Sequence, residues 1–159
     1  MNVAAAVITV SDRSYRKERD DESGDTLQRL LEAFGAGRVE RLLVPDRKKA
    51  IAGALTELCD AGEICLILTT GGTGLDPGDV TPEATIEVID RPAPGFAEAI
   101  RAAGINHTPR AMLSRAVSGI RGRTLIINLP GSPAACRQSF AVIKPVLGHA
   151  LEVLGGSGH

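Results

Sequence analysis

The stretch EICLILTTGGTGLDPGDVTPEAT, residues 63–85, decides the fold class of this chain. Residues 63–70 form an apolar run of the kind found in strands that are buried on both faces of a parallel sheet. The glycines that follow end the strand, and Thr81, Pro82 and Glu83 supply a helix cap, a first-turn proline and a first-turn acid. The stretch therefore predicts a buried strand, a glycine turn and a helix, in that order.

The alternation of strand and helix continues along the rest of the chain. Apolar runs predict strands, and apolar residues at helical spacing predict helices. Strands are expected at residues 4–10 and 38–46, helices at 26–35, 47–62, 81–90, 96–104 and 134–154, and a strand–turn–strand unit at 115–129. In the last helix, Pro145 and Gly148 predict a kink or a break. This order predicts a single three-layer α/β/α domain with a mostly parallel sheet over residues 1–154, followed by a flexible tail at 155–159.

Composition and charge narrow the possible function classes. The 18 Lys and Arg residues nearly balance the 19 Asp and Glu residues, so no net field draws the chain to nucleic acid or to an anionic membrane. An aromatic content of 3% leaves few side chains for the stacking platforms of single-strand nucleic-acid binders. The apolar N-terminus is too short to span a bilayer, so we expect a cytoplasmic protein with no nucleic-acid or membrane partner.

The spacing of cysteine and histidine argues against several kinds of site. Cys59, Cys65 and Cys136 form no CxxC pair and lie at no metal-ligand spacing from a histidine, so neither a zinc site nor a disulfide framework is expected. The 3 histidines lie in or beside helical segments or at the chain end, where no Ser-His-Asp or Cys-His arrangement follows. Nucleophilic catalysis by a side chain is disfavoured, whereas phosphoryl chemistry, which depends on positioning and metal, fits.

Small polar residues follow four of the predicted strands. Ligands of such sheets bind beyond the carboxyl ends of the strands, so we expect these loops to converge on one edge. Glycines there permit positive φ angles and bring backbone N–H groups close to a ligand, although TTGGTG is neither a P-loop nor a dinucleotide motif and could simply turn a corner. The residues are Ser11, Asp12, Asp46, Gly71, Gly72, Gly74, Asn128, Pro130, Gly131 and Ser132.

The carboxylates near these strand ends allow two interpretations. Asp46 and Asp79 each precede a predicted helix and could cap its N-terminus. Carboxylate oxygens, together with phosphate oxygens, are also the ligands that Mg²⁺ prefers. Thr81 is the better-placed cap of its helix, which frees Asp79 for a metal, whereas the two roles of Asp46 can coexist.

Several motifs, in this order, resemble the molybdopterin adenylyltransferase family of molybdenum cofactor biosynthesis, which includes the gephyrin G domain. The resemblance covers essentially the whole chain. It implies a trimeric α/β/α protein that takes MgATP and molybdopterin, transfers AMP to the terminal phosphate of molybdopterin, releases pyrophosphate and passes its product to a molybdenum insertase. The motifs are SDR at 11–13, DESGD at 21–25, TTGGTG at 69–74, DVTPEAT at 79–85, APGF at 93–96 and MLSRAVSGIRGRTLIINLPGSP at 112–133.

The resemblance also implies roles for individual residues. The essential aspartates of the family fall on Asp46 and Asp79, which would organise Mg²⁺, the triphosphate and the attacking phosphate. The pterin-phosphate site falls on Ser114 and Arg115, whose forked guanidinium suits a phosphate, with Thr81 and Pro82 nearby in the motif. The nucleotide region falls on Ser11, Asp12, Gly71, Gly72, Thr73, Gly74, Pro130 and Gly131.

One position departs from the family pattern. Many members carry arginine immediately before the DVTP aspartate, whereas this chain has Gly78, which leaves its rate or subgroup open. A glycine at this position is shared with a shorter bacterial paralogue group that has an accessory role in the pathway, and this role is one alternative. A non-enzymatic molybdopterin carrier or scaffold is another. An insertase would carry a similar domain within a much longer multidomain chain, which 159 residues disfavour.

Overall fold

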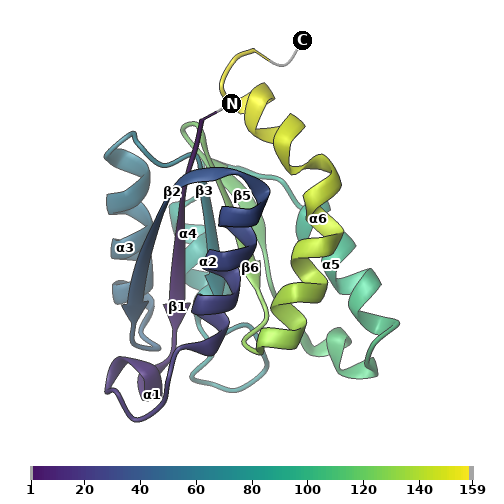
Figure 1. Cartoon of the computed structure of the whole chain (residues 1–159). Coiled ribbons are helices and arrows are strands. Elements are labelled where there is room, and N and C mark those ends of the chain that lie inside the picture. Colours follow the sequence, from purple (N-terminus) through teal and green to yellow (C-terminus); the bar gives the residue numbers. More distant parts are fainter. Residues whose placement is uncertain (1, 158–159) are drawn as a thin grey trace.

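The computed structural model describes residues 2–157, and its elements follow the predicted alternation of strands and helices (Figure 1). All of the predicted strands and helices are present, and the structure adds a short helix α1, the strand β4 and the 3-10 helix η1. In chain order the elements are β1 (Val3–Val10), α1 (Asp12–Tyr15), α2 (Glu22–Phe34), β2 (Ala36–Val44), α3 (Lys48–Asp60), β3 (Leu66–Thr70), α4 (Thr81–Val88), β4 (Arg91–Pro92), α5 (Gly95–Ile105), η1 (Pro109–Leu113), β5 (Ser118–Arg121), β6 (Thr124–Leu129) and α6 (Pro133–Leu154).

The six strands form a single mixed sheet in the order β2-β1-β3-β6-β5-β4. The first four of these strands run parallel to one another. At the side of the sheet beyond β6, β5 pairs antiparallel with β6, and β4 pairs antiparallel with β5. The register aligns Thr9 with Thr70, and Thr70 with Leu129. The carboxyl ends of the parallel strands therefore lie level at one edge of the sheet, which is the lower end in Figure 1, beside α1.

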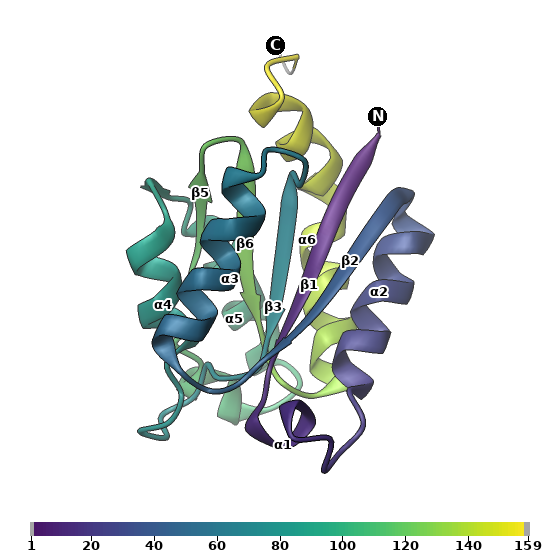
Figure 2. The same ribbon diagram turned by 90° about the vertical axis from the view of Figure 1, so that its left-hand side faces the viewer.

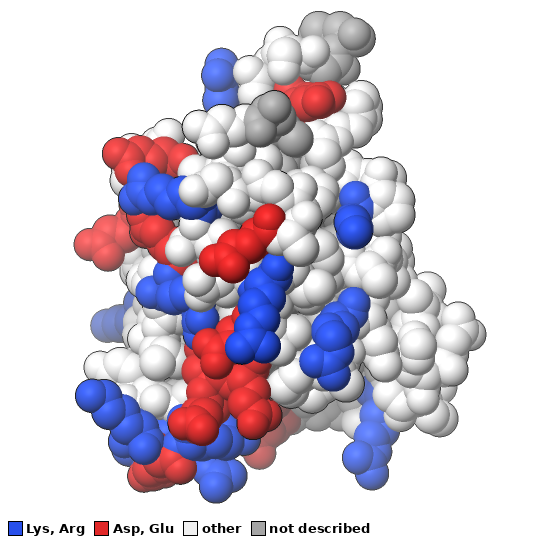
Figure 3. Space-filling model, in the orientation of Figure 1, with Lys and Arg blue, Asp and Glu red and all other residues white. Residues whose placement is uncertain are grey.

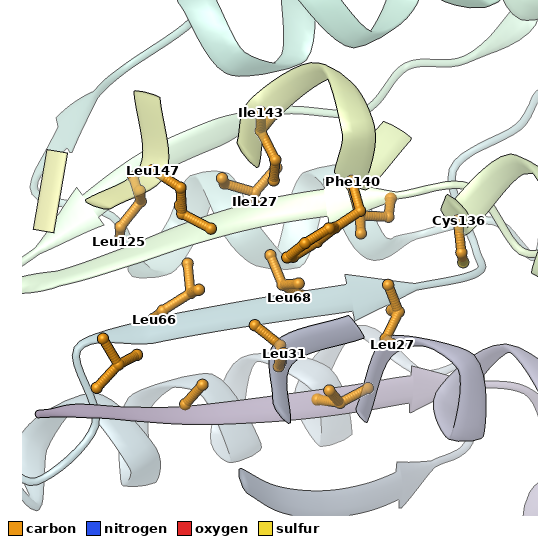
Figure 4. Packing of buried hydrophobic residues seen from close by; sticks show 14 of the residues in the cluster. Leu27, Leu31, Leu66, Leu68, Leu125, Ile127, Cys136, Phe140, Ile143 and Leu147 are labelled. Carbon is orange, nitrogen blue, oxygen red and sulfur yellow. The ribbon is translucent and has the colours of Figure 1, made fainter. Parts of the chain in front are cut away.

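Helices cover both faces of the sheet, so the predicted three-layer α/β/α fold is confirmed (Figure 2). Helices α2, α5 and α6 pack on one face, where Leu27 and Leu31 of α2 and Phe140 of α6 lie against Leu68 of β3 (Figure 4). Helices α3 and α4 pack on the other face. Burial of each large side chain of this kind contributes about 1.5–3 kcal/mol, which makes the parallel strands a rigid base for the loops at their ends.

Of the predicted kink or break in the last helix, the break is wrong, because α6 runs without interruption from Pro133 to Leu154, and the kink stays a prediction. Pro145 lies inside the helix with its side chain exposed, so water can hydrate the carbonyl group that lacks a partner. Buried residues on both sides of it, Ile143 and Leu147, hold the helix against the sheet. Tertiary packing therefore overrides the local preference of proline.

Two helix starts also differ from expectation. Helix α2 begins at Glu22 rather than at residue 26, because the carboxylate of Asp21 accepts the N–H of Gly24 (3.0 Å) and caps the helix. Thr81 was expected to cap α4, and this was wrong: it is the first residue of the helix, and Val80 precedes it without a side-chain cap bond. The Thr81 hydroxyl instead donates to the carbonyl of Gly71 (3.0 Å).

The chain beyond α6 is described only in part. Gly155 ends the helix, and residues 158–159 of the predicted flexible tail lie outside the described residues, so that flexibility stays a prediction. Among the residues that the structure describes, no helix is both long and apolar enough to cross a membrane.

Candidate functional site

A cavity of about 860 Å³ opens at the carboxyl edge of the sheet. Loops that follow β1, β2, β3 and β6 line it, as the sequence predicted for the small polar residues at the strand ends. The predicted site residues that it brings together are Ser11, Asp12, Asp46, Gly71, Gly72, Asp79 and Gly131, with Ser132 beside them.

Two reciprocal hydrogen bonds between Asp12 and Asp46 join the loops that follow β1 and β2. The N–H of Asp12 donates to Oδ2 of Asp46 (2.9 Å), and the N–H of Asp46 donates to Oδ1 of Asp12 (2.9 Å). Ser11 caps the short helix α1 by accepting the N–H of Ser14 (3.2 Å). Asp46 does not cap α3, whose first turn has no side-chain cap bond, so the structure does not realise the capping role that the sequence allowed.

The glycine turn after β3 requires glycine for two separate reasons. Gly71 and Gly72 have φ angles of +97° and +70°, which side chains rarely adopt. A Cβ at Gly71 would also overlap the carbonyl oxygen of Val10, and one at Gly72 would overlap the hydroxyl of Thr81. At Gly74 a Cβ would lie 2.8 Å from Oδ2 of Asp79. The turn therefore lies directly against the end of β1 and against the loop that carries Asp79.

Carboxylates are crowded at the mouth of this cavity. Burial raises the pKa of Asp46, and the nearby carboxylates of Asp12, Asp79 and Asp76 raise it further, while the hydrogen bond from the backbone of Asp12 opposes the shift. Among residues 2–157, no group of three or more His, Cys, Asp or Glu side chains could hold a metal ion by itself. Two carboxylates with unsatisfied negative charge fit a Mg²⁺ that arrives with a polyphosphate, because phosphate oxygens complete its coordination.

Basic side chains also line the same cavity, together with the carboxylates of Asp20, Asp21 and Glu22 from the same segment of the chain. Arg13, Arg16 and Arg19 line it, and Figure 3 shows Lys and Arg side chains beside Asp and Glu side chains at the lower end of the molecule, around α1. Ser132 caps the long helix α6 at the cavity wall by accepting the N–H of Ala135 (3.1 Å). Sequence reasoning missed these arginines, although the dense run of basic residues after SDR was a usable signal.

A second cavity of about 260 Å³ adjoins the first at Gly131, which lines both. It is less polar, since Ile100, Leu113 and Val142 contribute to its wall. Sequence reasoning did not find these residues, which come from α5, η1 and α6, because they carry the periodicity of ordinary core positions. The predicted site residues that line this cavity rather than the first are Thr73, Gly74, Ser114 and Pro130.

Three of the predicted pterin-phosphate residues line neither of these two cavities. Thr81 and Pro82 are buried at the start of α4. The guanidinium of Arg115 pairs with the carboxylate of Glu83 (2.7 Å) and donates to backbone carbonyls of the loop before α4. The structure thus brings Ser114 to a cavity. Thr81 and Arg115 instead hydrogen-bond to Gly71 and Gly74 of the glycine turn, and Pro82 is buried beside Thr81 in α4.

The fold and the paired cavities define a three-layer α/β domain with a candidate ligand site at the carboxyl edge of its parallel strands. Residues 6–149 match the family described as "Probable molybdopterin binding domain". The chain belongs to this family, as the motifs indicated.

Three comparisons place the chain within the family. It is 35% identical over 153 residues to the molybdopterin adenylyltransferase of Helicobacter pylori, a match that covers 95% of this chain and 87% of that protein. It is 40% identical over 155 residues to the molybdenum cofactor synthesis protein cinnamon of Drosophila melanogaster, but it spans only 26% of that longer protein. The solved molybdopterin biosynthesis enzyme MoaB of Thermus thermophilus is similar with a TM-score of 0.89 and 44% identity, over 97% of each chain.

Proposed function

We propose that this chain is a molybdopterin adenylyltransferase that transfers AMP from MgATP to the phosphate of molybdopterin. The observation that carries the proposal is the placement of Asp46, Asp79 and the glycine turn in one polar cavity that adjoins a second, less polar one at Gly131. Relatives of similar length that bear this enzyme's name support it. Two cavities that meet suit a reaction between two phosphorylated substrates.

The nucleotide would occupy the larger cavity. The backbone of Gly71 and Gly72 can approach its phosphates closely, and the arginines after β1 supply positive charge in the lining of the same cavity. Asp46 and Asp79 would hold the Mg²⁺ that accompanies ATP, which would neutralise negative charge between the two substrates. Asp12 fixes the position of Asp46 through the two hydrogen bonds between them, and the N–H of Ser11 donates to the carbonyl of Val44 at the end of β2 (3.0 Å).

Molybdopterin would occupy the smaller cavity, with Ser114 on its wall. Thr73, Gly74 and Pro130, which the resemblance assigned to the nucleotide, line this cavity as well, so we assign them to molybdopterin instead. Apolar side chains there suit a flat pterin ring, and Gly131 lies where its phosphate would meet the nucleotide. A phosphate oxygen of molybdopterin attacks the α-phosphorus of ATP, the bond from that phosphorus to the bridging oxygen breaks, and pyrophosphate leaves. The attacking phosphate is already ionised at neutral pH, so no side chain needs to act as a base.

The partners implied by the resemblance belong to the same proposal: a homotrimer that passes adenylylated molybdopterin to a molybdenum insertase. The paralogue alternative rested on Gly78, and the structure gives that glycine a local role. Its N–H donates to Oδ1 of Asp76 (2.7 Å), and a Cβ at this position would lie 3.1 Å from the same oxygen. Gly78 therefore fits a tight turn in the loop that carries Asp79, and this turn supplies no specific support for an accessory role.

One assay separates the enzyme from a carrier. Purified protein with MgATP and molybdopterin should release pyrophosphate and form adenylylated molybdopterin, whereas a carrier would bind molybdopterin without releasing pyrophosphate. Asp79→Asn keeps the shape of the side chain and removes its charge, so we expect turnover to fall by about 100-fold or more in a folded protein. Asp60→Asn, which breaks the remote pair with Arg121, is the matched control and should keep full turnover. Unchanged turnover in folded Asp79→Asn would refute the role of that carboxylate.

A further inference from the structure

All three nitrogens of the Arg115 guanidinium are occupied by one loop and the helix that follows it. Nε donates to the carbonyl of Gly74 (2.8 Å), and Nη2 donates to the carbonyl of Asp79 (2.7 Å). Nη1 and Nη2 also bind the two carboxylate oxygens of Glu83 in α4, at 2.7 and 3.2 Å. The backbone N–H of Arg115 donates to the carbonyl of Thr73 (2.8 Å). One side chain thus joins both ends of the loop to the first turn of α4.

The loop between Gly74 and Asp79 has its own internal hydrogen bonds. The N–H of Asp79 donates to the carbonyl of Asp76 (2.8 Å), and the N–H of Gly78 donates to the Asp76 carboxylate (2.7 Å). These bonds set the shape of the turn but not its place in the molecule, because both partners belong to the same loop. Leu75 at its tip is 62% exposed and does not anchor it. Arg115 supplies contacts that fix the loop relative to the body of the protein.

Four of the five N–H groups of the guanidinium already donate to protein acceptors, so a phosphate could bind it through two parallel hydrogen bonds only by displacing some of these contacts. Two carbonyl oxygens and one carboxylate already accept its hydrogen bonds, and Glu83 would remain beside the incoming anion. The hydrogen bond from Arg115 is the main cause that lowers the pKa of Glu83, so this carboxylate stays ionised at neutral pH and would repel a phosphate. The guanidinium of Arg115 therefore binds acceptors of the protein itself.

We propose that Arg115 is a positioning residue that places the Asp79 carboxylate in the nucleotide cavity, and that it is not a ligand of the pterin phosphate. The kinetic part of this inference rests on the proposed adenylyl transfer. A displacement of about 1 Å in a group that organises the reacting phosphates lowers turnover by about 100-fold, and a contact made by Arg115 to Asp79 itself transmits such a displacement directly.

The chain offers a matched control in Arg121. Its guanidinium binds both carboxylate oxygens of Asp60, at 3.0 and 3.1 Å, and donates to the carbonyl of Val88 (2.9 Å). It therefore makes the same kinds of contact as Arg115, but at the other end of α4. Arg121→Ala removes an equivalent set of hydrogen bonds without touching the loop that carries Asp79.

The first test needs neither substrate nor metal. Hydrogen exchange of the backbone amides at residues 74–81 is compared between the unaltered protein, Arg115→Ala and Arg121→Ala. We expect exchange in this segment to accelerate by about tenfold or more in Arg115→Ala and to be unchanged in Arg121→Ala. Arg115→Lys keeps the charge and loses the fork, so it should also accelerate exchange, and it serves if the alanine variant does not fold. Unchanged exchange in either folded Arg115 variant would overturn the inference.

The second test distinguishes positioning from phosphate binding. Arg115→Ala should lower kcat by about 100-fold and leave the Kd of molybdopterin, measured without ATP, unchanged. Glu83→Gln should lower kcat as well, because it loosens Arg115. If Arg115 were a phosphate ligand, its loss would weaken molybdopterin binding, and Glu83→Gln would tighten it by removing a repulsive charge; either result would overturn the inference. Absence of AMP transfer in the unaltered protein would refute the proposed function alone, and the exchange measurement would still decide the positioning role.

Discussion

The substitution Gly71→Ala tests whether the glycine turn is required by the structure at the cavity floor. Gly71 has a φ of +97°, and holding alanine there costs about 1–3 kcal/mol. The new Cβ would also overlap the carbonyl oxygen of Val10, a backbone atom at the end of a buried strand that cannot rotate away. Overpacking of this kind costs about 1–3 kcal/mol more. The sum of the two ranges centres on about 4 kcal/mol.

Gly122→Ala separates these two costs. Gly122, in the turn between β5 and β6, has a φ of +60° but open space around the position of a Cβ. Only the left-handed backbone is penalised there, at about 1.5 kcal/mol. The expected difference between the two variants is therefore about 2.5 kcal/mol, which for an m-value of about 2 kcal/mol/M lowers the urea midpoint of Gly71→Ala by about 1.2 M more than that of Gly122→Ala.

Urea denaturation followed by circular dichroism measures both midpoints and both slopes. If the two alanine variants lose the same stability, the close approach of the turn to β1 contributes nothing, and the account of the cavity floor fails. A change of slope in Gly71→Ala alone would mean that the compactness of the denatured or native state had changed or that unfolding was no longer two-state, so the midpoints are compared only if the slopes agree.

Three further outcomes are expected. Because the folded-state pKa of Asp46 is raised, its ionised carboxylate destabilises the fold at neutral pH; this penalty shrinks as pH falls through the folded-state pKa and is gone below the unfolded-state pKa. Asp46→Asn in EDTA should therefore be more stable than the unaltered protein at pH 7, and the two should converge in acid; lower stability of the variant at pH 7 would contradict this. Asn128→Ala should cost about 3 kcal/mol of unfolding free energy, since it leaves the N–H of Val117 without its buried acceptor and removes donors to Thr69 and Thr85; calorimetry measures this loss, and one below about 1 kcal/mol would be too small for that network. Sedimentation should give the mass of three chains, and the mass of one chain would refute the trimer.

The sequence was sufficient to predict the parallel strands of the sheet and the edge at which the cavity opens. Strands β1, β3 and β6 are continuous apolar runs because helices cover both of their faces. Such runs can be recognised in the sequence alone. The loops at their ends then had to converge, which brought Asp12, Asp46 and the glycine turn together. Local periodicity and topology thus carried the prediction.

Contacts between side chains distant in the sequence were not predictable in the same way. Arg115 and Glu83 lie 32 residues apart, and no local pattern shows that they pair. The resemblance to the family assigned Arg115 to a phosphate because its motif suits one, yet the fold supplies a carboxylate and two carbonyls first. The predicted cap of α4 was wrong for a similar reason. Thr81 is 0% exposed, and its hydroxyl donates to the carbonyl of Gly71, a partner that only the tertiary structure brings near.

Asp46 and Asp79, the two carboxylates proposed to hold Mg²⁺, cap no helix, and this has a chemical consequence. A carboxylate that caps a helix has its charge satisfied by N–H groups, and it would bind a cation weakly. Neither α3 nor α4 has a side-chain cap bond, and within residues 2–157 no hydrogen bond reaches Oδ1 of Asp46 or Asp79. Both oxygens remain available, in surroundings where burial first and the neighbouring carboxylates second raise the pKa of Asp46. A cation that arrives with the triphosphate would stabilise the ionised carboxylates, so the instability at the cavity mouth and the proposed binding of MgATP have the same electrostatic origin.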